Sequence, residues 1–164
     1  MTKDRPRNMS ASVRQRLRNV AQAQREDFGL VLTRYSLERL LYRLAQSDHV
    51  DHFVLKGAML FQLWQGNLHR PTRDLDLLGH GDPDPDRIAS VFRDVCRQFV
   101  DDDGLTFHAE SSPLLWGLPR PGPMSSLQLV ILAQRQRNRH RGPFIFTTLE
   151  FKGSSVRGDV SRGD

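Results

Sequence analysis

The sequence predicts an α+β protein in which helices near the N-terminus precede a sheet that carries the functional residues. Residues 53–81 read as a short apolar strand, a glycine turn, a helix and a second strand. Residues 10–25 and 32–47 place apolar side chains at helical spacing, which predicts two helices before that unit. At 164 residues we expect one domain that buries a hydrophobic core without disulfides or metals to hold it together.

Caps and periodicity predict the remaining elements. Ser10 or Ser12 is the predicted N-cap of the first helix. Asp84, with Pro85 after it, predicts the start of a helix that runs to about residue 100. Further strands are predicted at 105–108, 127–132 and 144–151. The apolar stripe of the helix after Asp84 consists of Ile88, Val91, Phe92, Val95, Cys96 and Phe99.

Two features of this region have structural interpretations. Cys96 lies on the apolar stripe, so we expect a buried, unreactive thiol. Three consecutive acids at 101–103 precede a glycine and are interpreted as a solvated turn. Adjacent turn residues do not converge on a metal as alternate strand residues do.

Composition favours a soluble cytoplasmic protein. One cysteine excludes a disulfide within the chain. The sequence has no apolar run of membrane-spanning length and no export signal at its N-terminus, so we expect no membrane association. The net charge of +5 is unevenly distributed. Residues 1–110 are neutral, whereas residues 111–164 carry the whole excess and are rich in Arg, Pro, Gly and Ser.

Two aspartates form the centre of the predicted site. Successive strand side chains alternate between faces, so Asp74 and Asp76 share one face about 7 Å apart while Leu75 and Leu77 point into the core. Two parallel carboxylates repel each other unless a cation lies between them. Hard oxygen ligands with few protein contacts suit Mg²⁺, which completes its shell with water and phosphate oxygens. Upstream, Gly57 allows close approach of a phosphate, and the helix after it presents N–H groups to anions.

These residues resemble a known family. The order Leu55-Lys56-Gly57-Ala58, then Arg70, Thr72 and Asp74-Leu75-Asp76-Leu77, resembles the nucleotidyltransferase toxins of the AbiEii type, within the DNA polymerase β-like superfamily. The resemblance covers residues 1 to about 110. Ala58 departs from the pattern, because the superfamily more often has Gly or Ser there.

The resemblance implies a DNA polymerase β-like nucleotidyltransferase core with N-terminal helices. It implies that Asp74 and Asp76 are catalytic and hold Mg²⁺, and that a nucleoside triphosphate supplies the nucleotide. Some members of the family add nucleotides to transfer RNA, so an RNA acceptor is expected, as is a cognate antitoxin protein. The predicted nucleotide-binding residues are Lys56, Gly57, Ala58, Arg70, Thr72 and Arg73.

Two of these assignments have an alternative. Arg70 and Arg73 either relieve the charge of an approaching triphosphate or RNA backbone, or simply balance the two aspartates. Thr72 is expected to hydrogen-bond the backbone where the aspartate strand begins. The superfamily also has a third carboxylate on a later strand. Glu150, in an apolar strand-like run, is the only candidate for this third metal ligand.

The C-terminal third departs from the family pattern. We divide the chain into residues 1–110, comprising the N-terminal helices and the catalytic core, and an atypical basic tail at residues 111–164. The tail is interpreted as out of frame, or the chain as truncated relative to a longer parent. Either interpretation predicts an incomplete sheet, poor packing beyond residue 110 and weak or absent catalysis.

Other functions are kept as alternatives. A nucleic-acid-binding module would use the basic tail without catalysis, through Arg135, Arg137, Arg139, His140 and Arg141. The chain could also be an inactive truncated nucleotidyltransferase. A glycosyltransferase would bind a metal and a nucleotide sugar through the two aspartates, but the upstream Lys56-Gly57 favours the polymerase-like arrangement.

Overall fold

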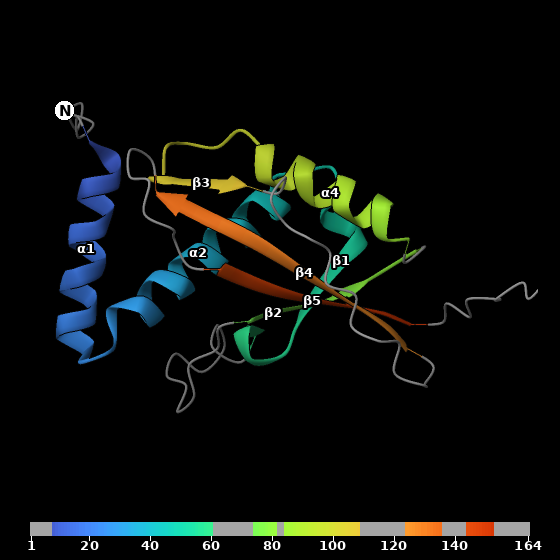
Figure 1. Ribbon diagram of the computed structural model, residues 1–164, viewed down its shortest axis with the longest axis horizontal. Coiled ribbons are helices and arrows are strands. Elements are labelled where there is room, and N and C mark those ends of the chain that lie inside the picture. The colour runs from blue at the N-terminus through green and yellow to red at the C-terminus, as the bar shows by residue number, and fades with distance from the viewer. Residues whose placement is uncertain (1–7, 61–73, 82–83, 109–123, 136–143, 153–164) are drawn as a thin grey trace, which may run out of the picture.

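The computed structural model describes residues 8–60, 74–81, 84–108, 124–135 and 144–152, with the backbone alone for 85, 108 and the last two ranges. It has an α+β fold, as the sequence predicts, with helices on one side of a five-stranded sheet (Figure 1). The helices are α1 (Met9–Gln24), α2 (Phe28–Ala45), the short 3₁₀ turn η1 (Val50–His52) and α4 (Pro85–Arg97). The strands are β1 (Phe53–Lys56), β2 (Asp74–Gly79), β3 (Leu105–His108), β4 (Met124–Arg135) and β5 (Phe144–Lys152).

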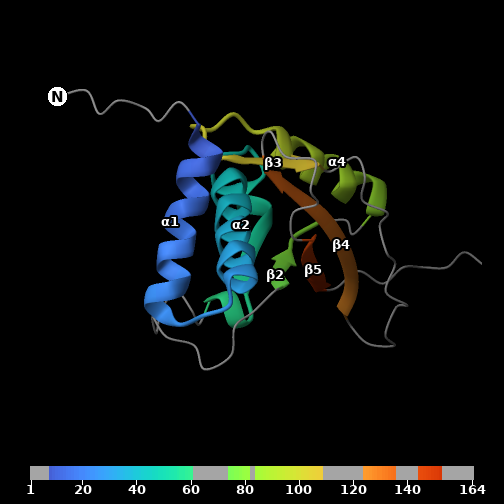
Figure 2. The ribbon, with the colours of Figure 1, turned by 60° about the vertical axis from the view of Figure 1, so that its left-hand side comes forward.

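The N-terminal helices form an antiparallel pair whose ends are set by local capping. The side chain of Asn8 accepts a hydrogen bond from the Ala11 N–H, so Asn8 is the N-cap of α1 and the prediction of Ser10 or Ser12 is wrong. Ser10 instead is buried, and its hydroxyl donates to the Gly104 carbonyl at 3.2 Å. Asp27 caps α2 in the same way as Asn8 caps α1. Figure 2 shows α1 lying beside α2, away from the sheet.

The strands follow the order β1-β2-β5-β4-β3. The β2–β5 pair is parallel and the other pairs are antiparallel. Each of the four strand pairings joins residues of the same parity, so even-numbered residues occupy one face of the sheet and odd-numbered residues the other. This alternation decides which residues reach the core.

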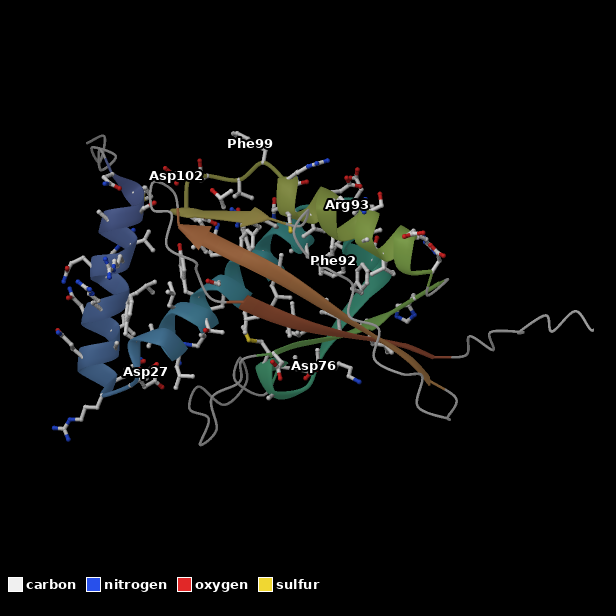
Figure 3. All side chains as sticks on the ribbon, viewed as in Figure 1. Asp27, Asp76, Phe92, Arg93, Phe99 and Asp102 are labelled. Atoms are coloured by element: carbon white, nitrogen blue, oxygen red, sulfur yellow. The ribbon has the colours of Figure 1, made fainter. Side chains whose placement is uncertain are left out.

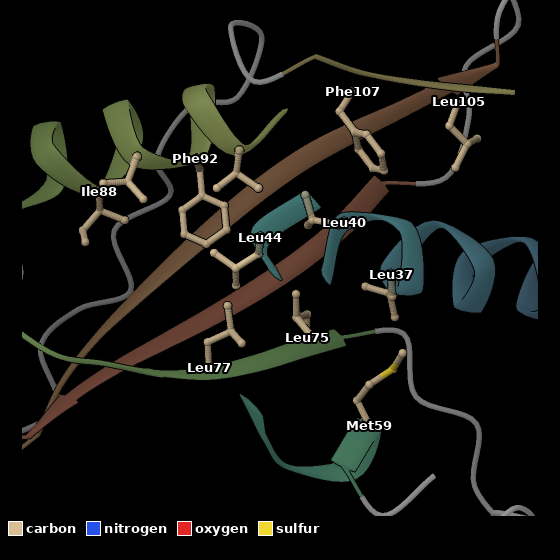
Figure 4. Packing of buried hydrophobic residues seen from close by; sticks show 12 residues of the cluster. Leu37, Leu40, Leu44, Met59, Leu75, Leu77, Ile88, Phe92, Leu105 and Phe107 are labelled. Atoms are coloured by element: carbon tan, nitrogen blue, oxygen red, sulfur yellow. The ribbon is translucent and has the colours of Figure 1, made fainter. Parts of the chain in front are cut away.

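The core lies between the odd-numbered face of the sheet and the helices α2 and α4, which cover it. Leu75 and Leu77 of β2 are almost fully buried. Figure 4 shows both leucines pointing toward Leu44 of α2 and Phe92 of α4. Apolar burial of this kind contributes about 25 cal/mol per Å² removed from water. The same packing therefore fixes β2 in place and turns its even-numbered residues away from the core.

Strands β4 and β5 come from the region that the sequence analysis treated as an atypical tail. The β4–β5 ladder runs from the pair Met124 and Lys152 to the pair Leu132 and Phe144. On its other side β5 pairs with the whole length of β2. The sheet therefore crosses the boundary placed after residue 110. Only the backbone of these two strands is described, so the expected poor packing beyond residue 110 and the expected incomplete sheet stay predictions. Residues 109–123, 136–143 and 153–164 lie outside the described residues.

The segment that follows α4 also differs from expectation. The helix ends at Arg97, and Phe99, assigned to its apolar stripe, is 92 % exposed (Figure 3). Asp103 is not solvated but buried, with its carboxylate 2.7 Å from Arg43 Nη1 and 2.8 Å from Arg39 Nε. This ion cluster joins α2 to the segment that leads into β3. Only Asp101 and Asp102 are exposed, as a solvated turn requires.

Candidate nucleotidyl-transfer site

The candidate site lies where β1 ends and β2 begins, on the even-numbered face of the sheet. Lys56 pairs in antiparallel register with Asp76. Asp74 is exposed, and both Asp76 and Lys56 are half-buried. Two residues of rise along one strand separate the aspartates by about 7 Å. The structure therefore places a cation and two carboxylates together on one face.

Gly57 packs directly on Asp76. Its φ of +72° lies in the left-handed region that favours glycine. A Cβ built at Gly57 would overlap the Asp76 carboxylate and come within 2.9 Å of the Cβ and Cγ atoms of Asp76. Both the backbone conformation and the lack of space therefore require glycine here. The turn and the aspartate, far apart in the sequence, form one unit.

A helix begins immediately after this turn. Residues 58–60 are helical, and the Leu60 N–H donates to the Gly57 carbonyl at 3.2 Å. Ala58 is exposed at the start of the helix, whereas Met59 is buried against the core. Figure 3 shows Asp76 beside this helical segment. The first N–H groups of a helix lack partners within the helix and carry a partial positive charge. The arrangement can thus bind an anion next to the two carboxylates.

The structure describes only part of the predicted nucleotide-binding set. Lys56, Gly57 and Ala58 are brought together with Asp74 and Asp76. Arg70, Thr72 and Arg73 lie outside the described residues, so their assignments stay predictions.

Glu150 lies on β5, in register with Leu78. Its position therefore shares the sheet face of the two aspartates, roughly 8 Å from Asp76 by backbone and about 14 Å from Asp74. The position level with Asp76 is Thr148. In the described part of the chain, no group of three or more His, Cys, Asp or Glu side chains lies close enough together to hold a metal. The described carboxylates at the site are therefore Asp74 and Asp76, with Glu150 placed by backbone register alone.

Sequence reasoning missed two aspects of this site. Three residues are opposite one another on neighbouring strands: Lys56, Asp76 and Thr148. This alignment depends on strand pairings that no local pattern encodes. The sequence analysis treated the Gly57 turn and the aspartate strand as two parts of one site, but it did not predict that Gly57 and Asp76 are in contact. Alternation within β5 was a signal for Thr148, because Thr148 and Glu150 fall on one face of the strand predicted at 144–151.

Comparison with known proteins identifies the family. A family model described as nucleotidyl transferase AbiEii toxin, of type IV toxin–antitoxin systems, matches residues 39–151. No curated protein matched the chain. The match begins within α2 and ends in β5, so it includes every strand of the sheet and extends past the expected limit near residue 110. It covers more than half of the sequence and confirms the resemblance. The chain therefore belongs to the AbiEii nucleotidyl transferase toxin family.

Proposed function

We propose that the chain is a Mg²⁺-dependent nucleotidyltransferase of a bacterial toxin–antitoxin system that acts in abortive infection. It transfers a nucleotide from a nucleoside triphosphate to an RNA acceptor, with transfer RNA as the acceptor class. The family supports a nucleotidyl transferase toxin and an antitoxin partner. The observation that carries the proposal for this chain is the contact between Gly57 and Asp76, which joins an anion-binding turn to a carboxylate pair. In the described part of the chain no helix is suited by length and hydropathy to cross a membrane, and we propose that the protein acts in the cytoplasm.

The donor set fits a hard divalent cation. Asp74 and Asp76 offer carboxylate oxygens from one strand face, and Gly57 leaves no side chain between them and the turn. Mg²⁺ binds through one or two carboxylates together with water and substrate phosphates. When bound, it would polarise phosphoryl oxygens and offset the charge that develops in the transition state.

The chain's own groups perform the remaining work. The backbone N–H groups at residues 58–60 and the Lys56 ammonium would hold the triphosphate. Asp74 and Asp76 would hold the metal, and the core packing of Leu75 and Leu77 holds these carboxylates in place. Phosphoryl transfer depends mainly on such positioning and electrostatic stabilisation.

The decisive assay follows transfer of label from each of the four nucleoside triphosphates to total cellular RNA, with Mg²⁺ or with a chelator. Transfer should require Mg²⁺ and be lost in Asp74→Asn and in Asp76→Asn. The matched control is Asp48→Asn, which removes the same charge from an exposed position outside the sheet, in the turn between α2 and η1. Equal activity in all three variants would contradict the site, and absence of transfer in every condition would contradict the function.

Metal binding can be tested without catalysis. Asp74→Asn should abolish Mg²⁺-dependent nucleotide binding in calorimetry. Its melting temperature without metal should be unchanged or slightly higher, because the substitution relieves repulsion between Asp74 and Asp76. Unchanged nucleotide affinity would show that Asp74 is not a ligand.

Glu150 is proposed as the third metal ligand. Glu150→Gln keeps the size of the side chain and removes its charge, so transfer should fall sharply if the carboxylate completes the metal site. Full activity in this variant would show that Asp74 and Asp76 act without it. A catalytically weak wild-type chain would match the distance of about 14 Å between the backbone positions of Glu150 and Asp74.

The nucleic-acid-binding alternative makes a different prediction. Binding through Arg135 and the basic residues that follow it would fall steeply with salt and would not depend on Asp74 or Asp76. RNA binding that persists in Asp74→Asn without any transfer would favour this alternative.

A further inference from the structure

The first helix carries a positive charge that the segment after it does not share. Residues 1–25 contain seven Lys and Arg residues and one Asp, whereas residues 26–110 contain nine basic and 15 acidic residues. Helix α1 together with its C-cap carries four arginines, at 14, 16, 18 and 25, and no carboxylate. The neutral total of residues 1–110 therefore combines a basic first helix with an acidic remainder.

Two of these arginines form a row near the C-terminal end of α1. Arg18 and Arg25 are both exposed, and their spacing of about two helical turns puts them on one side of the helix. Figures 1 and 2 show α1 at the outside of the molecule, with its C-terminal end at the same height as the turn that follows β1. The row formed by Arg18 and Arg25 thus lies toward the end of the molecule that holds the candidate site.

Neither arginine of this row is paired with a carboxylate in the described part of the chain. Arg18 Cζ lies 5.7 Å from the centroid of the Phe28 ring. Such stacking uses the face of the guanidinium group and leaves the N–H donors at its edge for an anion. Arg34, Arg39 and Arg43 of α2, by contrast, all form ion pairs with described carboxylates.

The two carboxylates that follow Arg25 are engaged by α2. Glu26 Oε2 lies 3.1 Å from Nη2 of Arg34, and Asp27 accepts a hydrogen bond from the Leu30 N–H at 3.1 Å. Their charge is therefore offset by Arg34 and by the positive end of the α2 dipole. A helix face that serves only for solubility commonly pairs its arginines with acids one turn away, and α1 contains no such acid.

An exposed row of arginines without acidic partners fits a ligand that is itself a chain of negative charges. Arg binds phosphate oxygens through two N–H groups at once, and phosphate contacts position a nucleic acid without reading its sequence. The acidic remainder of residues 26–110 would repel the same ligand, so the basic helix also favours one place of contact.

We propose that Arg18 and Arg25 of α1 form a docking surface for the phosphate backbone of the acceptor RNA. This inference rests on the proposed function, because that reaction modifies the RNA that α1 would hold. Contacts away from the reacting end bind the ground state and the transition state equally. They therefore lower KM for the RNA and leave kcat unchanged.

The test measures binding of 5′-labelled bulk transfer RNA to the full chain by fluorescence anisotropy between 50 and 200 mM salt. The variant is the double substitution Arg18→Gln with Arg25→Gln. Its matched control is Arg87→Gln with Arg93→Gln, which removes the same charge from α4. Arg18→Lys with Arg25→Lys keeps the charge of the row. Calorimetry with a nucleoside triphosphate reports the candidate site separately.

The α1 glutamine variant should bind the RNA roughly 10- to 30-fold more weakly at 150 mM salt, and its slope of log K against log salt should fall by about 2. The α4 control and the lysine variant should keep most of the wild-type affinity, and all variants should bind the nucleotide equally. RNA affinity unchanged in the α1 variant, or reduced as much in the α4 control, would overturn the proposal. If the double variant does not fold, Arg25→Gln alone is tested, with a slope change of about 1 expected.

Other occupants of the α1 row give different results. Polyglutamate that binds as tightly as the RNA and is lost in the same variant would assign the row to an acidic protein segment. A change in self-association with unchanged RNA affinity would assign it to a second copy of the chain. Either result would overturn the proposal.

Failure of the proposed function is a separate result. RNA binding that depends on the α1 row, without transfer in any condition, rejects the enzyme and keeps the docking surface. Transfer that depends on Asp74 with the same KM for RNA in the wild type and the α1 variant keeps the enzyme and rejects the docking surface.

Discussion

Substituting Gly57 by alanine tests the contact on which the site depends. Two costs follow from the structure. A left-handed conformation at φ +72° costs an alanine about 1–2 kcal/mol, which lowers the melting temperature of a chain this size by roughly 2–8 °C. The added methyl group would also overlap the Asp76 carboxylate, which must therefore move. A displacement of about 1 Å at a catalytic group can reduce the rate by about 100-fold. Gly57→Ala should therefore be folded but at least about 100-fold slower.

Gly104 provides a matched control for this experiment. Its φ is +76°, and a Cβ there would lie 3.0 Å from Ser10 Cα, so Gly104→Ala incurs a similar backbone strain and a close contact with backbone atoms outside the site. Gly104 precedes β3, at the edge of the sheet opposite β1. Gly104→Ala should consequently lower stability without a specific loss of transfer.

The assay compares thermal unfolding, nucleotide binding and label transfer for the wild type and both variants, well below the lowest melting temperature. The two variants should resemble each other in stability and differ in transfer. If Gly57→Ala retains wild-type transfer, Asp76 does not need its observed position and the reasoning fails. If both variants lose transfer equally, the loss reflects stability and not the site.

Three predictions concern stability and reactivity. Asp103→Asn leaves the buried Arg43 guanidinium without its charged partner and should cost about 3–5 kcal/mol in urea unfolding. Burial alone would raise the pKa of Asp103, but hydrogen bonds from Arg43 and Arg39 outweigh it and hold that pKa below its usual value. Its stabilising effect should therefore be complete above about pH 4 and be lost as the pH falls further, so the difference between wild type and variant should shrink in acid. Asp84→Ala removes the 2.8 Å bond to the Arg87 N–H and should destabilise α4 by about 1 kcal/mol in the same assay. Burial raises the pKa of the Cys96 thiol to about 12, so native protein at pH 8 should resist iodoacetamide while unfolded protein reacts; rapid native alkylation would contradict the buried position.

Local signals predicted the aspartate strand and its surroundings well. The alternation of Asp74, Leu75, Asp76 and Leu77 encodes both the strand and the face that is buried, because period-two patterning needs no distant partner. Asp84 with the following proline marked the start of α4, since an N-cap acts on N–H groups within one turn. These features depend on neighbours in sequence, and the structure places them as expected.

Features that depend on distant partners could not be predicted in this way. Asp103 looked like a turn residue because its partners Arg39 and Arg43 lie in α2, 64 and 60 residues earlier in the chain. Strands were predicted at 127–132 and 144–151, but the pairing of β5 with β2 was not, because β4 and β5 carry apolar residues on both faces in part of their length, which blurs the alternation. Asn8 and the two serines are residue types that cap helices equally well, so sequence alone could not identify the N-cap of α1. In the structure the Ser10 hydroxyl donates instead to the Gly104 carbonyl.

The position of β5 between β2 and β4 has a consequence for synthesis. During translation Asp74 and Asp76 emerge long before Phe146, their neighbour across the parallel ladder, and the middle of the sheet is supplied last. Pairing between strands far apart in the sequence slows folding, because the chain loses the entropy of closing a long loop before the strand contacts stabilise it. A ribosome-bound fragment that ends before residue 144 would lack the central strand. We therefore expect the candidate site to be completed only after nearly the whole described chain has been synthesised.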